Sequence, residues 1–390
     1  MKVVIVGGGV GGVACARRLA RRSGDVQVAL VDRTLRHDFP PSFPWLAVGR
    51  RRPERISRPL TGLARHGVEV RQAEVEGFDA GAGTLATSAG ELRFDRLVLA
   101  PGAVLAPEAI PGLGEAAHHF YTREAAERLR DALAGFGGGR VLIVVASMPF
   151  KCPAAPYEVA FLIDAMLREW GVAARVDVVT AEPQPMPVAG REVGEQVAAL
   201  LAARRIGFEP GRELASVDAL AREARFADGD GGEPYDLLVA VPPHRVPAFV
   251  ADSSLAGPSG WIPVDRSSLR ARADGVHAIG DVTSIMLANE MLLPKAGVFA
   301  EDEAEVVADN LAAEAAGRAP TAAFEGHGAC FLETGGGRAG FASGDFYAQP
   351  APRVRMRPPA RRWHWGKALL ERRWLSRLPR GAAPESPGGI

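Results

Sequence analysis

MKVVIVGGGVGGVACARRLA, residues 1–20, is the stretch that decides the fold of this chain. Val3–Val6 is a continuous apolar run, which is typical of a parallel strand covered on both faces. Gly7, Gly9 and Gly12 follow, and the residues after them are rich in alanine, arginine and leucine. A strand, a glycine turn and a helix in this order predict a dinucleotide-binding unit, with the pyrophosphate at the start of the helix.

A second strand strengthens this interpretation. The apolar run Val26–Val31 ends at Asp32, 20 residues beyond Gly12. A carboxylate at this place can accept a hydrogen bond from a ribose hydroxyl, and it would repel a 2′-phosphate. The glycine pattern alone is weak, but the strand, the helix and the spaced aspartate together make it strong. Cys15 lies among alanines in the helix, where a small buried filler is the simpler interpretation.

A later strand is also followed by a turn, but this turn lacks the glycine pattern. Arg140–Val145 is another buried strand, and the residues that follow it read ASMPFKCP and include Cys152. An enzyme that binds both FAD and a nicotinamide would show glycines at both turns. A thiol and a proline in this place predict an electron donor that reacts with cysteine rather than a nicotinamide.

Composition sets broad limits. With 390 residues, 47% of them hydrophobic and 24% charged, we expect an ordinary globular protein of two or three domains. The net charge of zero gives no indication of nucleic-acid binding, and no metal site is expected. The sequence contains no apolar run of 18 residues, so no membrane span is predicted. The sequence begins its first strand without a charged leader, so we expect a cytoplasmic location. In such a reducing compartment, we do not expect the three cysteines to form a structural disulfide framework.

Two later segments favour FAD. Phe94–Gly102 (FDRLVLAPG) resembles the strand and turn that pass behind FAD in flavin disulfide reductases, although Pro101 departs from the usual threonine. Gly275–Asp281 (GVHAIGD) resembles the second FAD segment, in which an aspartate binds the ribityl chain. A buried strand that ends in a glycine turn would explain either segment alone, but both occur in the expected order.

Together these motifs make residues 2–378 resemble the sulfide:quinone oxidoreductases and the flavoprotein of flavocytochrome c sulfide dehydrogenase. The most specific segments are CPAAPYE from Cys152, LPKAGVFA from Leu293, and GACF from Gly328. The resemblance implies an α/β fold with two Rossmann-like, three-layer domains of the flavin disulfide reductase type and a C-terminal cap with an amphipathic helix. The implied domains are an FAD-binding domain (1–118 and 251–310), a central domain that carries Cys152 (119–250), and the cap (311–390).

The resemblance also implies the chemistry. Cys152 and Cys330 form a redox-active pair that sulfide or a related sulfane-sulfur donor opens, and electrons pass through FAD to a quinone. Glu158 handles sulfur or protons, unless it only complements the helix dipole. From the residues alone, Lys151 and a helix that begins near Pro156 both predict a lowered thiol pKa for Cys152.

The assigned FAD site combines the motifs above with the segment that precedes the helix-like EDEAEVVADNLAAEAA. In the family this helix points its amino-terminal end at the flavin, and Lys295 adds charge there or is simply solvated. FAD is expected to bind noncovalently, because no cysteine lies near Ser42. The assigned residues are Gly7, Gly9, Gly12, Asp32, Val75, Ala100, Gly102, Gly280, Asp281, Lys295, Ala296 and Gly297.

Departures from the family pattern leave alternatives open. Tyr121 stands where most sulfide:quinone oxidoreductases have a third cysteine, and Ala125 and Pro187 stand near the places of two histidines. Two cysteines without a third resemble the flavocytochrome c flavoprotein, so a soluble enzyme with a cytochrome acceptor is one alternative. The others are an NAD(P)H-dependent flavin reductase, including a type II NADH dehydrogenase, and a non-catalytic FAD-binding protein.

Residues 361–378, RRWHWGKALLERRWLSRL, are basic and aromatic. On a helix, Trp363, Leu370, Trp374 and Leu378 fall within one stripe flanked by arginines, which is the pattern of a helix on an anionic membrane surface. We therefore expect peripheral association with the cytoplasmic face of the membrane. The alternative is a helix that packs on the protein's own core or on a second copy, and the sequence leaves open whether the chain forms a homo-oligomer.

Overall fold

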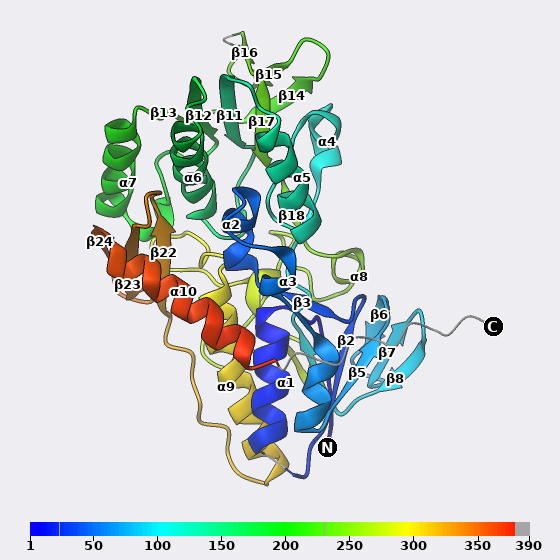
Figure 1. Cartoon of the computed structure of the whole chain (residues 1–390). Coiled ribbons are helices and arrows are strands. Elements are labelled where there is room, and N and C mark those ends of the chain that lie inside the picture. Colours follow the sequence, from blue (N-terminus) through cyan, green and yellow to red (C-terminus); the bar gives the residue numbers. More distant parts are fainter. Residues whose placement is uncertain (23, 230, 379–390) are drawn as a thin grey trace, which may run out of the picture.

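Two parallel sheets, each covered by helices, organise the molecule (Figure 1). The computed structural model describes residues 1–22, 24–229 and 231–378. The lower sheet has the strand order β20-β9-β1-β2-β5, and the upper sheet has the order β13-β12-β11-β17. The fold is thus the predicted α/β arrangement with two Rossmann-like units.

The lower sheet takes its strands from distant parts of the chain. β1 pairs in parallel with β2 on one side and β9 on the other, and β20 adds to β9 from about 180 residues further along. The glycine turn follows β1 and leads into α1, as the sequence predicted. The elements are β1 Lys2–Val6, α1 Val10–Arg22, β2 Gln27–Asp32, β5 Val68–Gln72, β9 Arg96–Leu99 and β20 Val276–Ala278.

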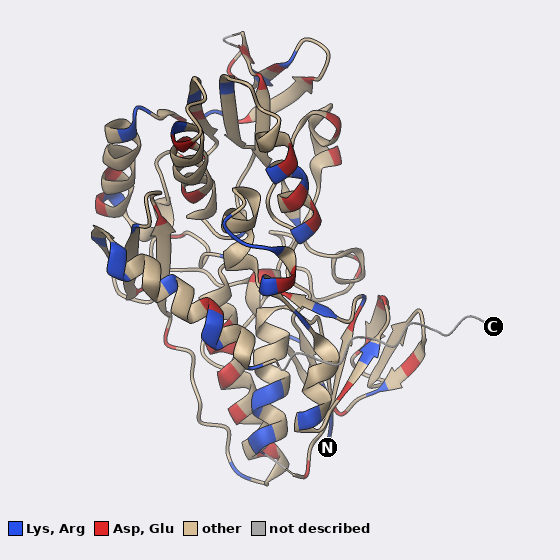
Figure 2. Cartoon of the chain, in the orientation of Figure 1, with Lys and Arg blue, Asp and Glu red and all other residues tan. Residues whose placement is uncertain are grey.

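Helix α9 (Gly297–Ala315) packs beside α1 on the lower sheet. Figure 2 shows Lys and Arg on α1 and Asp and Glu on α9. Arg18 of α1 binds Glu305 at 2.8 Å and Asp309 at 2.7 Å, so ion pairs join the two helices.

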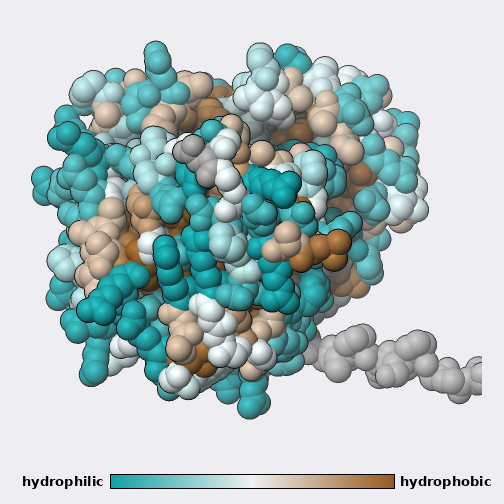
Figure 3. All heavy atoms as spheres, turned by 90° about the horizontal axis from the view of Figure 1, so that it is seen from above, coloured by the Kyte–Doolittle hydropathy of each residue, from teal (hydrophilic) through white to brown (hydrophobic). Residues whose placement is uncertain are grey.

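The upper sheet lies entirely within residues 139–241. Every residue from Val141 to Val145 is buried, as expected for a central parallel strand. Its strands are β11 Gly139–Val145, β12 Ala174–Thr180, β13 Gly207–Pro210 and β17 Leu237–Val241, and the helices of this unit are α5 Arg123–Ala134, α6 Ala155–Glu169 and α7 Arg191–Arg204. The end of the molecule beyond this sheet is mostly hydrophilic, with hydrophobic residues in small separate areas (Figure 3).

The C-terminal part is an antiparallel sheet and a long helix. β22 (His327–Glu333), β23 (Ala339–Asp345) and β24 (Arg353–Ala360) pair in sequence order, and α10 (Arg361–Ser376) packs against them. In Figure 1, α10 (red) runs from this sheet down to α1. Residues beyond 378 lie outside the described part of the chain.

Short elements connect these units. The short strands are β3 Arg36–Asp38, β4 Ser57–Pro59, β6 Val75–Asp79, β7 Thr84–Thr87, β8 Gly90–Arg93, β10 Val104–Leu105, β14 Leu214–Asp218, β15 Glu223–Phe226, β16 Gly232–Pro234, β18 His244–Arg245, β19 Ile262–Pro263 and β21 Thr283–Ser284. The short helices are α2 Phe43–Ala47, α3 Pro53–Ile56, α4 Leu113–Ala116 and α8 Ala248–Ala251, with 3₁₀ turns at Pro40–Ser42, Leu60–His66, Pro107–Ala109, Pro187–Ala189 and Gly280–Val282.

Candidate active site

The glycine turn after β1 is packed so closely that two of its glycines have no room for a side chain. A Cβ atom on Gly7 would lie 2.2 Å from the carbonyl oxygen of Ala100, and one on Gly12 would lie 1.8 Å from the carbonyl oxygen of Gly7. Gly9 differs, because a Cβ there would meet nothing within 4 Å. The turn therefore keeps open space beside Gly9, at the start of α1, where an anionic group can approach the backbone.

Asp32 at the end of β2 fixes the turn from the other side. Its Oδ2 accepts a hydrogen bond from the backbone N–H of Gly8 at 2.6 Å, and its Oδ1 accepts from the N–H of Thr34 at 2.7 Å. The carboxylate thus holds the glycine turn, a role that the fingerprint did not predict. Its remaining lone pairs are free to accept from a ribose hydroxyl. Val75, also assigned to this site, begins β6 two residues after Ala73, whose N–H donates to the Asp32 carbonyl.

The second predicted segment lies next to the first. β20 pairs with β9, so Gly280 follows at the same sheet edge as Ala100 and Gly102. The N–H of Gly280 donates to Glu303 at 2.6 Å. The Asp281 carboxyl has no hydrogen-bond partner among the described residues, and burial raises its pKa. An acidic side chain held at this edge without a partner fits a site that receives hydroxyl groups from a ligand.

Lys295 is buried, but its ammonium group already has partners. It donates to the carbonyl oxygens of Asp281 at 2.8 Å and Thr283 at 3.0 Å and lies over the ring of Trp261. Burial lowers its pKa to about 8. Lys295 therefore braces the loop that carries Asp281, and it is not the solvated residue that one interpretation expected. Ala296 and Gly297 follow it and begin α9, whose first turn has neither a side-chain cap nor an acidic residue.

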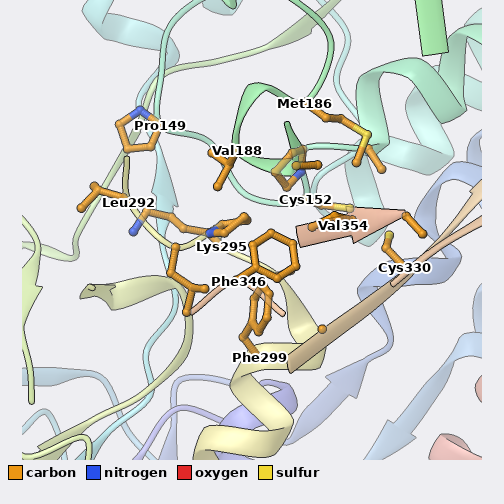
Figure 4. Close-up of a pocket in the computed structure, with 18 of the residues that line it drawn as sticks. Pro149, Cys152, Met186, Val188, Leu292, Lys295, Phe299, Cys330, Phe346 and Val354 are labelled. Atoms are coloured by element: carbon orange, nitrogen blue, oxygen red, sulfur yellow. The ribbon is translucent and has the colours of Figure 1, made fainter. Parts of the chain in front are cut away.

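Cys152 and Cys330 line one apolar pocket between the two sheets and the C-terminal part (Figure 4). The pocket also includes Lys295 and Ala296 of the predicted flavin segment. Phe299 and Phe346 pack edge to face with ring centres 5.0 Å apart, and Figure 4 shows the side chains of Cys152 and Cys330 on the same side of the pocket. Folding thus brings together two cysteines that are 178 positions apart in the sequence.

The backbone around Cys152 is tied to the flavin segment. Its N–H donates to the carbonyl oxygen of Lys295 at 2.6 Å, and Lys151 and Lys295 form an isolated parallel bridge. Cys152 has a φ of 57°, which few residues with a side chain adopt. Helix α6 begins at Ala155, close to the predicted start at Pro156.

The predicted lowering of the Cys152 pKa is wrong. Burial is the largest effect, and together with the charges of Cys330 and Glu158 it raises the pKa of the Cys152 thiol above its usual range. Burial likewise raises the pKa of Cys330 to about 11. The helix and Lys151 do not overcome this loss of hydration. In both cases the charge that lowers the thiol pKa comes from Lys367.

Glu158 lies in the first turn of α6, as predicted, but it is buried and paired. Its Oε1 accepts a hydrogen bond from Lys367 of α10, and its Oε2 lies 3.4 Å from the N–H of Glu333. Glu333 in turn contacts Nδ1 of His364 at 2.9 Å. Lys367, Glu333 and His364 were not among the predicted site residues. The available signal was a lysine inside a basic and aromatic segment that was interpreted as a helix on the membrane surface.

The predicted apolar stripe of the tail faces the protein's own core. Trp374 and Leu378 are buried, and Trp363 stacks on Phe341, so Leu370 alone of the four is exposed. The Trp374 indole N–H donates to Nε2 of His37 at 2.8 Å. The stripe prediction is therefore wrong for three of its four residues, because α10 uses that side to pack.

Nδ1 of the same His37 ring lies 2.8 Å from the Gly8 carbonyl oxygen. An indole N–H that donates to Nε2 leaves the proton of a neutral imidazole on Nδ1, which then donates to Gly8. Burial lowers the pKa of His37, which favours this neutral form. The C-terminal helix is thus hydrogen-bonded, through one histidine, to the glycine turn.

The comparisons with known proteins agree with this arrangement. A family model described as pyridine nucleotide-disulphide oxidoreductase matches residues 1–296. The chain belongs to the pyridine nucleotide-disulphide oxidoreductase family. The mouse mitochondrial sulfide:quinone oxidoreductase is 26% identical, over 90% of this chain and 79% of its own length. A NADH dehydrogenase-like protein of Mycobacterium tuberculosis is 32% identical, but over only 38% of either chain.

The sulfide-quinone reductase of Aquifex aeolicus is 27% identical, over 97% of this chain and 91% of its own length. The crystal structure of the Aquifex sulfide:quinone oxidoreductase has a TM-score of 0.87 and 25% identity, and the match covers 97% of this chain and 91% of that one. The resemblance inferred from the motifs is confirmed. This member of the family is an FAD-dependent oxidoreductase.

The second dinucleotide turn, which family members can use for a nicotinamide, is altered here. The residues after β11 lead to Cys152, and Pro149 and Phe150 line the pocket. Glu182 follows β12, at the place of a ribose-binding carboxylate, but it is buried and accepts hydrogen bonds from Tyr157 and Thr180. Both of its carboxylate oxygens already accept hydrogen bonds within the protein, Oε2 from these two hydroxyls and Oε1 from the N–H of Met186.

Tyr121, at the place of the expected third cysteine, is buried near this pocket. Its ring packs edge to face on His244 at 5.1 Å, and its hydroxyl has no hydrogen-bond partner among the described residues. Ala125 is buried in α5, and Pro187 lines the pocket.

Proposed function

We propose that this oxidoreductase oxidises sulfide or a related sulfane-sulfur donor at Cys152 and Cys330 and passes the electrons through FAD to a quinone. The observation that carries the proposal is the shared pocket, in which two cysteines from distant segments meet the flavin segment at Lys295 and Ala296. The sulfide oxidation and quinone reduction in the names of the mouse and Aquifex relatives agree with it.

In the proposed reaction, hydrosulfide attacks a Cys152–Cys330 disulfide. One new sulfur–sulfur bond forms, the disulfide breaks, and the second cysteine leaves as a thiolate. The exchange needs both an attacking and a leaving sulfur, so neither cysteine suffices alone. FAD held beside the pocket would supply the two-electron acceptor that links these sulfur atoms to the quinone. Glu158 would take up the proton that hydrosulfide brings to the new persulfide.

We further propose that FAD lies across the edge where β1, β9 and β20 end. Gly7 and Gly12 permit the close turn, Gly9 leaves space for the pyrophosphate, and Asp32 accepts from the ribose. Val75, Ala100, Gly102 and Gly280 border the cofactor, and Asp281 accepts from the ribityl chain. Lys295 positions Asp281, while Ala296 and Gly297 present the free N–H groups of α9. The residues assigned to this site bind FAD noncovalently.

The domain division 1–118 with 251–310, 119–250 and 311–390 is also a proposal. Support comes from the lower sheet, which combines β1 to β9 with β20, and from the upper sheet, which lies between residues 139 and 241.

The donor can be tested with the yellow holoenzyme under anaerobic conditions. We expect sulfide to bleach the flavin absorbance quickly and NADH or NADPH to bleach it slowly or not at all. The reason is that the turn after β11 lacks the glycines that bind a pyrophosphate, and Glu182 already accepts a hydrogen bond from Tyr157. Stopped-flow absorbance with each donor measures the difference. Rapid bleaching by NADH would favour the NAD(P)H-dependent reductase instead.

We propose that the exposed side of α10 binds the membrane surface. None of the helices in the described part of the chain is long and apolar enough to cross a membrane. Trp365, Leu369 and Leu370 are 67%, 47% and 41% exposed. Four exposed arginines accompany them: Arg361, Arg362, Arg372 and Arg373. This apolar and basic surface, rather than the predicted stripe, has the composition of an interfacial helix.

This surface can be tested without disturbing the packed side of the helix. In a Trp365→Ser, Leu369→Ser, Leu370→Ser variant we expect less co-sedimentation with anionic liposomes and slower reduction of a decyl-quinone, while sulfide still bleaches the flavin. Each arginine adds about 1 kcal/mol of attraction to anionic lipid, so salt should weaken the binding of the unchanged protein. Trp170→Ser, which removes an exposed tryptophan from the end of α6, is the matched control. Undiminished liposome binding by the triple variant would favour a soluble enzyme with a protein acceptor.

A further inference from the structure

The described residues include a group of buried charges on α6, which follows Cys152, on β22, which carries Cys330, and on α10. Three of its four members come from the C-terminal part of the chain. The group is Glu158 of α6, Glu333 of β22, and His364 and Lys367 of α10, and we refer to it as the charge cluster. The side chains of Glu158, Lys367 and Glu333 are 5%, 6% and 1% exposed, while that of His364 is 28% exposed. Only His364 therefore reaches solvent to an appreciable extent.

The charges of the cluster do not balance without one more proton. Two carboxylates and one ammonium group leave one negative charge, which is costly in a buried place. That charge disappears when His364 is protonated or when one carboxyl is neutral. Burial raises the pKa of Glu158, and Glu333 adds to this, whereas Lys367 opposes it. The cluster thus has two alternative places for one proton, one at the sulfur end and one at the solvent end.

The cluster acts on both thiols. The charge of Glu158 raises and the charge of Lys367 lowers the pKa of Cys152 and of Cys330. Both thiols are otherwise kept protonated by burial, so each must lose a proton before it can act as a nucleophile. Other groups also lie near the cluster. The Trp45 ring of α2 lies 4.6 Å from the Lys367 ammonium, and Glu371, further along α10, pairs with Arg51. Arg357 of β24 lies over the ring of Trp363.

We propose that the charge cluster receives the proton that each thiol releases, and that Lys367 is the positioning residue that makes both thiolates accessible. A cysteine S–H bond breaks, its electron pair stays on sulfur, and Glu158 takes up the proton. Release of that proton to water returns the cluster to its former charge, so one thiol yields one thiolate and one hydrated proton. The inference rests on the proposed role of Cys152 and Cys330 and assigns Glu158 and Lys367 to that chemistry.

The test is alkylation of the cysteines in the reduced holoenzyme by a small reagent, iodoacetamide, with the labelled positions identified by peptide mass spectrometry. In Lys367→Met we expect the alkylation of Cys152 and Cys330 to slow about tenfold, which corresponds to a rise of about one unit in thiol pKa. Lys367→Arg keeps the charge and should stay within about threefold of the unchanged protein. Glu158→Gln should act in the opposite direction and speed alkylation, because it removes the charge that raises the thiol pKa.

A further variant separates charge from packing. Arg373→Met removes an exposed positive charge from the same helix and should leave alkylation unchanged. If Lys367→Met and Glu158→Gln changed the alkylation rate equally and in the same direction, the proposal would be overturned. Loss of packing would act in the same direction in both variants, whereas loss of opposite charges would not.

Lys367→Met leaves the Glu158 carboxylate buried without its partner, so folding itself is at risk. If this variant does not retain FAD, the Glu158→Gln, Lys367→Met double variant, which removes both charges of the pair, decides the question. Alkylation slower than in Glu158→Gln alone supports the proposal, and an equal rate overturns it. A failure of sulfide to reduce the flavin would contradict the proposed function. The alkylation rates would still test the charge cluster, because alkylation needs neither sulfide nor a quinone.

Discussion

Replacement of either Cys152 or Cys330 by serine should slow flavin reduction by sulfide on the order of 10³-fold or more, while FAD stays bound. The reason is geometric. Both sulfur atoms reach one pocket beside Lys295 and Ala296, and thiol–disulfide exchange needs an attacking sulfur and a leaving sulfur. A serine hydroxyl can take neither role at neutral pH. Stopped-flow absorbance of the flavin with excess sulfide measures the rates, and the bound flavin is quantified after denaturation.

Cys15→Ala is the matched control for this experiment. Cys15 is buried in α1, and burial keeps its pKa well above that of an exposed thiol. Its removal deletes a cysteine without touching the pocket, so rapid sulfide reduction should persist. If both serine variants retained unchanged rates, Cys152 and Cys330 would be structural thiols, and the proposed chemistry would have to be abandoned.

The second large effect concerns the glycine turn. In Gly12→Ala the new methyl group would meet the Gly7 carbonyl oxygen at 1.8 Å, which is backbone that cannot simply rotate away. We expect a loss of about 3 kcal/mol or more in the free energy of unfolding, together with loss of FAD. Thermal unfolding of the apoprotein measures the first effect, and flavin retention during gel filtration measures the second.

Gly9→Ala is the informative comparison, because a Cβ at Gly9 meets nothing within 4 Å. The stability of the apoprotein should therefore change by less than about 0.5 kcal/mol. FAD affinity should nevertheless fall on the order of 10- to 100-fold, because the methyl group would occupy space that we assign to the pyrophosphate. Unchanged FAD affinity in this variant would place the pyrophosphate elsewhere.

The local structure of the proposed FAD site could be predicted because its signals are local. The glycine turn, Asp32 and the strands before Ala100 and Gly280 each depend on a few neighbouring residues, and the structure has these elements where the sequence placed them. The helix after Cys152 could be predicted for the same reason. The direction of the Cys152 thiol pKa could not, because it depends on how deeply folding buries the sulfur.

The second half of the site depends on contacts across long sequence separations. Lys367 and Glu158 are 209 positions apart, and Trp374 and His37 are 337 positions apart. A helical period shows which residues share a side of α10, but it does not show whether that side faces lipid or protein. The arginines around the predicted stripe favoured a membrane, whereas the structure buries Trp374 and Leu378 and exposes Trp365 and Leu369.

The hydrogen bonds from Trp374 through His37 to Gly8 also bear on how the protein is made. A ribosome releases the glycine turn long before the tryptophan, and domains begin to fold in the order of synthesis. The turn must therefore wait until Trp374 has been synthesised before this neighbour arrives. If FAD binds at this turn as proposed, flavin that binds earlier enters a site without this support, so firm retention of the cofactor requires α10 as well as the N-terminal turn.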